Sequence, residues 1–217
     1  MTGTVSHRNG KKLLGQMLVG AVVGGAATGG LLMVWKGRGL DLSDPAQMFA
    51  LVAGMIYLLI GMMVGFGALA PRAGARFLNV EDVDELRVER PILGFSAIAC
   101  VLTGMFFLVL AAIPADGSDG LVNRDAAAVV AAACLTGLVA MTRSTNRRVD
   151  ELTRQVSMEA SALAMHAVML FLCGWAALAH LGYANWISPL AFVSALALLL
   201  LASVFWVGAK RGMVTPR

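Results

Sequence analysis

Six predominantly apolar runs dominate the sequence, and most of them are long enough to cross a lipid bilayer. They cover residues 13–34, 46–70, 91–113, 125–141, 156–180 and 186–207. A transmembrane helix needs about 20 consecutive apolar residues, because the hydrocarbon core of a bilayer is about 30 Å thick. A helix also pairs its own backbone groups, as lipid requires. The pattern therefore predicts an all-α integral membrane protein, a bundle of six transmembrane helices forming a single membrane domain over residues 1–217.

The composition agrees with a membrane protein and argues against nucleic-acid binding. The chain is 59% hydrophobic and 14% charged, whereas a soluble domain is about half apolar and about a quarter charged. Its net charge of +4 comes from Lys and Arg at the ends of the apolar runs. No basic stripe with interleaved aromatic residues is present, so we expect the lipid bilayer as a partner and no nucleic acid.

The distribution of Lys and Arg predicts the orientation. If six helices cross the membrane, fourteen of the 17 Lys and Arg residues fall on one side, and only Lys36, Arg38 and Arg124 fall on the other. Basic residues accumulate on the cytoplasmic side of membrane proteins. Both termini are therefore expected in the cytoplasm, and Tyr183 and Trp186 at the outer interface.

Two polar segments, residues 71–90 and 142–155, are expected as cytoplasmic helical linkers. The start of the second span is marked by Ser43 or Asp44 as an N-cap followed by Pro45, which suits the first position of a helix. The first span has small residues that also fit a signal-peptide cleavage site, but its apolar run continues past Ala27, which favours an anchor.

Glycine spacing in the first two spans predicts close helix contacts. Gly20 and Gly24, Gly25 and Gly29, and Gly61 and Gly65 are each separated by four residues. Such spacing allows helix backbones to approach closely in lipid. These spans could therefore contact other membrane proteins or a second copy of the chain, although glycine is also simply tolerated in membrane helices.

The tetrapeptide V-D-E-L occurs twice, at residues 83–86 and 149–152. It places Asp84 and Glu85, and then Asp150 and Glu151, in the two cytoplasmic linkers just before a span. A parallel duplication, as in some transporters, would produce this pattern. Acidic residues also stabilise the start of any helix, which explains the charges without a duplication.

The second of these segments carries a resemblance. The pattern Asp150-Glu151-Leu152 and Arg154, followed by Glu159-Ala160 at the opening of a span, resembles small multi-pass bacterial membrane proteins of unknown function. Some such proteins accompany helix-turn-helix regulators. Over residues 149–180 the resemblance implies a location in the bacterial inner membrane and a regulatory role there.

Few side chains within the spans could take part in catalysis or binding, and four of them lie on one face of the fifth span. Glu159, His166, Cys173 and His180 follow one another at seven-residue spacing. Ionisable residues inside a membrane are costly and mark candidate functional positions. Because seven residues span about 10.5 Å of a helix, these groups cannot chelate one ion together. We expect a polar seam facing neighbouring helices.

A metal site is conceivable only if other helices contribute to it. Cys100, Cys134 and His166 are expected at similar depths, about 12–15 Å below the cytoplasmic edge. If their helices were neighbours, these side chains could bind copper or zinc. No cofactor is otherwise expected.

The chain lacks the common hydrolase and metalloprotease motifs, so an enzyme is not expected. We interpret it as an accessory or regulatory interaction protein that acts through its helix bundle and charged linkers. A small transporter or channel is the first alternative, and a Cys/His metal or redox protein is the second.

Overall fold

The computed structural model describes residue 22 and residues 24–36, 44–70, 83–113, 122–146 and 151–211, with the side chains of 83–89 and 146 excluded. Every regular element in these ranges is an α-helix. Residues 24–36 are helical, and five longer helices follow them. These are α2 (Pro45–Leu69), α4 (Val83–Ala111), α5 (Arg124–Asn146), α6 (Glu151–His180) and α7 (Pro189–Lys210).

All five of these helices are long and apolar enough to cross a membrane. The chain is thus a helical, multi-pass membrane protein. The expected first span lies partly outside the described residues, as do the linker residues 71–82 and 147–150.

Local capping determines where two of the helices begin. Asp44 is the N-cap of α2, its carboxylate accepts the Ala46 N–H at 2.9 Å, and Pro45 follows at the first position. This confirms the predicted start. At α7 the helix begins at Pro189 and not at residue 186, because Ser188 caps it by accepting the Ala191 N–H at 3.2 Å.

Three helices extend beyond the expected apolar runs. α4 begins at Val83, so Pro91 lies inside this helix and does not start it. α5 continues to Asn146 and α6 begins at Glu151, because polar residues next to an apolar run can still continue the helical hydrogen bonding. The described parts of both linkers therefore belong to the long helices.

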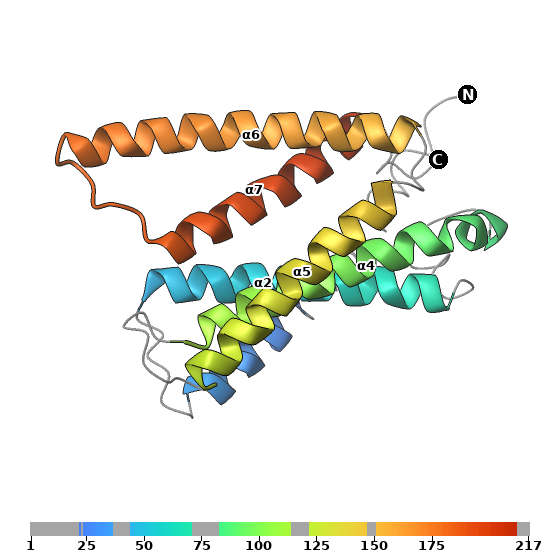
Figure 1. Cartoon of the computed structure of the whole chain (residues 1–217), viewed down its shortest axis with the longest axis horizontal. Helices are drawn as coiled ribbons and strands as arrows, with labels where there is room; N and C mark the ends of the chain where they lie inside the picture. Colours follow the sequence, from blue (N-terminus) through green and yellow to red (C-terminus); the bar gives the residue numbers. More distant parts are fainter. Residues whose placement is uncertain are drawn as a thin grey trace, which may run out of the picture.

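Helix α2 occupies the centre of the bundle (Figure 1). It packs on one side against α4, which in turn contacts α5, and on the other against α7, which contacts α6. The fully or nearly buried core comes from α2, α4 and α7 and comprises Ala50, Leu51, Ala53, Met55, Tyr57, Phe107, Ala111 and Ala197. Residues of the 24–36 helix, among them Leu31 and Trp35, pack against this core.

Glycines allow α2 and α4 to approach each other closely. A Cβ added to Gly61 would lie 2.8 Å from Cγ2 of Val101, and one added to Gly65 would lie 3.5 Å from Cβ of Ala97. The pair at Gly61 and Gly65 therefore lies at a helix contact within the chain. By contrast, a Cβ at Gly25 or Gly29 would meet no atom within 4 Å.

Helix α6 stands apart from this core. Of its 30 residues only Ala160, Ala164 and Val168 are buried. It crosses α7 near the cytoplasmic end expected from the sequence and diverges from α7 toward the connection 181–188 (Figure 1). Because the two helices diverge, a cavity lies between them, and the start of α2 also lines it.

Candidate functional site

A cavity lies between the start of α2, the second half of α6, α7 and the α6–α7 connection. Its volume is about 1010 Å³. The walls are mostly apolar or aromatic, and polar side chains occur only among its residues near the helix starts. The lining residues are Asp44, Pro45, Ala46, Phe49, Phe171, Trp175, Ala184, Asn185, Trp186, Ile187, Ser188, Ala191, Ala195, Leu198, Leu199 and Ala202.

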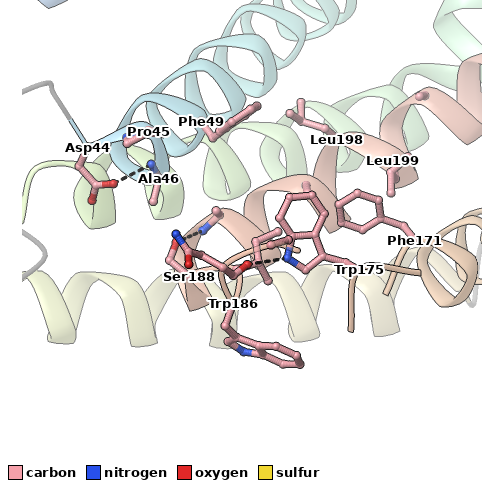
Figure 2. A pocket seen from close by; sticks show the side chains of 16 residues that line it. Asp44, Pro45, Ala46, Phe49, Phe171, Trp175, Trp186, Ser188, Leu198 and Leu199 are labelled. Atoms are coloured by element: carbon pink, nitrogen blue, oxygen red, sulfur yellow. Dashed lines mark hydrogen bonds between the residues drawn. The ribbon is translucent and has the colours of Figure 1, made fainter. Parts of the chain in front are cut away.

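An aromatic pair from α6 forms one wall of the cavity. The rings of Phe171 and Trp175 lie 5.9 Å apart, centroid to centroid, at an interplanar angle of 32°. The indole Nε1 of Trp175 donates a hydrogen bond of 3.0 Å to the backbone oxygen of Asn185 (Figure 2). This bond ties the side of α6 to the connection that leads into α7, and so holds the wall in place.

The polar groups of the cavity gather at one end. Asp44 and Ser188 are the N-caps of α2 and α7, and Asn185 lies three residues before Ser188. Capping explains why Asp44 and Ser188 occur here, since each accepts a hydrogen bond from a backbone N–H at the start of a helix. The cavity is thus amphipathic along its length, with polar groups at one end and apolar side chains over the rest.

A second cavity of about 510 Å³ lies on the other side of the same two helix starts. Asp44, Ala46 and Ser188 line both cavities. Gln47 lines the second one and donates from Nε2 to the backbone oxygen of Ile113 at 2.8 Å. This hydrogen bond satisfies a side chain that is only 4% exposed and joins the start of α2 to the end of α4.

The residues considered for a metal site do not come together. Cys100 is on α4 and Cys134 on α5, whereas His166 is on α6, which packs mainly against α7. Among the described residues no three His, Cys, Asp or Glu side chains are placed to hold a metal ion. The condition set by the sequence, that the three helices be neighbours, is therefore not met.

Apart from Glu159, the polar stripe of α6 lies away from the α7 contact. His166, Cys173 and His180 are exposed, and Nδ1 of His166 is 2.7 Å from the backbone oxygen of Ala162 in the same helix. That carbonyl can only accept, so Nδ1 carries the proton of this hydrogen bond. Within the described structure, the expected seam with neighbouring helices is therefore formed only at Glu159.

Glu159 is paired with Arg211, at the end of α7. Its Oε2 accepts hydrogen bonds from Nε of Arg211 at 3.0 Å and from Nη2 at 2.5 Å. The carboxylate side chain is 42% exposed and the guanidinium side chain 34% exposed. The pair lies at the end where α6 and α7 approach each other. This partner explains why an acidic residue occurs about one turn inside an apolar run.

The acidic linker residues are only partly described. Glu151 forms a 3.9 Å ion pair with Arg154 within α6, and both side chains are largely exposed. The side chains of Asp84 and Glu85, and the whole of Asp150, lie outside the described residues.

Sequence reasoning missed the polar groups that join helices in the core. Tyr57 donates from its hydroxyl to the backbone oxygen of Ala197 at 2.7 Å, linking α2 to α7. Gln47 links α2 to α4 in the same manner. Both are polar side chains inside an apolar run, and this was the available signal, since such groups need a partner in lipid.

No protein-family model, curated protein or solved structure matches the chain. The arguments about its function therefore rest on its own geometry.

Proposed function

We propose that the chain is an accessory or regulatory interaction protein of the membrane, and that it binds a transmembrane helix of a partner along the outer face of α6. The observation that carries this proposal is the exposure of the polar stripe of α6 at membrane depth. Polar side chains on a helix surrounded by lipid are costly, whereas a helix that packs against a partner helix can bury them in the contact.

The geometry of α6 separates its two faces. Ala164 is buried toward α7, and His166 follows two residues later. Two residues rotate a helix by about 200°, so His166 projects from nearly the opposite side. Cys173 and His180 share this side through the seven-residue spacing, whereas the carboxylate of Glu159, near the start of α6, reaches Arg211 at the end of α7. The inner face therefore belongs to the bundle, and the outer face is left to other contacts.

Energetics favour a protein partner on the outer face. Ionisable residues in transmembrane segments almost always face protein or a water-filled cavity, because their exposure to hydrocarbon is costly. A seven-residue repeat is also the spacing at which two helices remain in contact when they pack with a crossing angle of about +20°. A partner helix would thus cover His166 and Cys173 in succession.

We extend the proposal to the whole topology. Six transmembrane helices, with both termini in the cytoplasm of a bacterial cell, account for the distribution of Lys and Arg in the sequence. The charged linkers then face the cytoplasm, where Glu151 and Arg154 are exposed. A regulatory protein at the inner membrane could be contacted from that side.

Transport receives less support. The helices are arranged in the order α5, α4, α2, α7, α6, and no ionisable Asp, Glu, Lys, Arg or His side chain is buried among the described ones. The buried polar side chains in this part of the chain are Gln47, Ser194 and Ser203. An ion or proton pathway generally relies on buried charges.

Cross-linking from Cys173 tests the proposal. In a Cys100→Ala, Cys134→Ala background, Cys173 is the single cysteine and can carry a photoreactive maleimide in native membranes. We expect illumination to give one discrete protein adduct. Mass spectrometry of that adduct then distinguishes a different protein from a second copy of the chain.

The matched control moves the cysteine to the inner face. The variant Val168→Cys, Cys173→Ala places it where Val168 is only 6% exposed, against α7. This position should give no adduct to another chain. If both positions yielded only lipid adducts, the outer face of α6 would not be a protein interface and the proposal would fail.

A further inference from the structure

The cavity between α2, α6 and α7 has the length of one lipid molecule. Its lining along α7 extends from Ser188 to Ala202. At about 1.5 Å per residue this stretch measures about 21 Å. Half of a bilayer, headgroup region included, is about 20–22 Å thick. A lipid lying along α7 would thus reach from the polar end of the cavity to its apolar end.

The volume of the cavity, about 1010 Å³, gives room for slender acyl chains.

The lining matches the chemistry of an amphiphile. Phe171, Trp175, Leu198 and Leu199 provide an apolar interior on α6 and α7, and Figure 2 shows them on the side of the cavity away from Asp44. The polar end carries the negative carboxylate of Asp44, together with Asn185 and Ser188. A negative charge at this end favours a headgroup with a positive charge or with hydrogen-bond donors over an anionic headgroup.

From these observations we propose that the cavity binds a single lipid, with its acyl chains along α7 and an amine-bearing headgroup at Asp44, Asn185 and Ser188. The site lies on the inner side of α6, and its occupation does not depend on a partner at the outer face. A lipid here fills the wedge between α6 and the bundle, and so sets how far α6 stands from α2.

Native mass spectrometry of the purified full chain, with phosphatidylethanolamine added in mild detergent, tests the site. We expect one retained lipid per chain. Ala195→Trp places an indole inside the cavity and should reduce the retained lipid by about tenfold or more, equivalent to at least about 1.4 kcal/mol of binding free energy. Leu196→Trp is the matched control, because Leu196 is 40% exposed on the same helix and does not line the cavity.

Two further variants guard against misfolding and test the headgroup. Ala202→Phe fills the other end of the cavity and should also release the lipid while helical content, measured by circular dichroism, is kept. Asp44→Asn retains an N-cap residue, so α2 should still form. It should abolish the preference for phosphatidylethanolamine over phosphatidylglycerol.

Any one of three results would overturn the proposal. The first is that the unmodified chain retains no lipid, and the second is that the variants at residues 195 and 196 lose it equally. The third is that a polypeptide and not a lipid occupies the site. An unchanged headgroup preference in Asp44→Asn would remove the assignment of the polar end.

Discussion

Gly54 and Gly104 meet backbone to backbone where α2 crosses α4. A Cβ added to Gly104 would lie 2.8 Å from the backbone oxygen of Gly54, and one added to Gly54 would lie 3.0 Å from the backbone oxygen of Gly104. The first distance is shorter than real Cβ contacts show, and the second is tighter than most of them. Close packing of this kind stabilises helix pairs in lipid, where burial of apolar surface contributes little.

Gly104→Ala should therefore destabilise the protein. Forcing a methyl group into a packed contact costs about 1–3 kcal/mol, because the helices must move apart. Thermal denaturation in detergent should show a lower midpoint. Gly94→Ala is the control on the same helix, since its Cβ would meet no atom within 4 Å. An equal midpoint for the two variants would argue against the close contact.

Tyr57→Phe should weaken the link between α2 and α7. The hydroxyl of Tyr57 is buried with its side chain, which is 8% exposed, and it donates to the oxygen of Ala197 at 2.7 Å. Loss of such a bond costs about 0.5–1.5 kcal/mol. The same denaturation experiment measures it. Tyr183→Phe should leave stability unchanged because Tyr183 is 81% exposed, and a shift as large as that of Tyr57→Phe would contradict the assignment.

The pair Glu159–Arg211 should contribute modestly to the closure of α6 on α7. Both side chains are more than a third exposed, so solvent screening limits the pair to about 1 kcal/mol or less. A double-mutant cycle with Glu159→Gln and Arg211→Ala should give a coupling in this range that falls as salt is raised.

The exposed pair Glu151–Arg154 provides the comparison, because its side chains are 68% and 72% exposed and 3.9 Å apart. We expect no measurable coupling there. Similar values for both pairs would mean that the Glu159–Arg211 contact has no special role.

Cysteine labelling should establish the orientation. In a background without native cysteines, Tyr183→Cys should react with a membrane-impermeant maleimide in intact cells, because the α6–α7 connection is expected outside. Lys210→Cys should react only after permeabilisation. The reverse pattern would overturn the proposed orientation of both termini.

Much of the fold could be predicted from the sequence because membrane insertion depends on local hydropathy. The apolar runs gave the class of protein, and Asp44 followed by Pro45 gave the start of α2. The start of α7 was placed three residues early, since Trp186 and Ile187 are apolar but precede the cap at Ser188. The position of apolar residues alone does not indicate at which residue a helix begins.

The candidate site was less accessible to prediction. The seven-residue spacing predicted one face for Glu159, His166, Cys173 and His180, but it did not indicate which neighbours that face would have. The metal hypothesis needed α6 beside α4 and α5, whereas α6 packs mainly against α7.

By itself, the sequence determined that this chain is a bundle of membrane helices, because a run of apolar residues has one low-energy solution in lipid. Only the tertiary structure decided which helices are neighbours. Lipid is as apolar as the helices, so hydrophobicity cannot rank the possible pairings. The neighbouring helices meet at the backbone contact of Gly54 with Gly104, the bond from Tyr57 to Ala197 and the ion pair of Glu159 with Arg211. The cavity beside α6 follows from that arrangement and from no single segment.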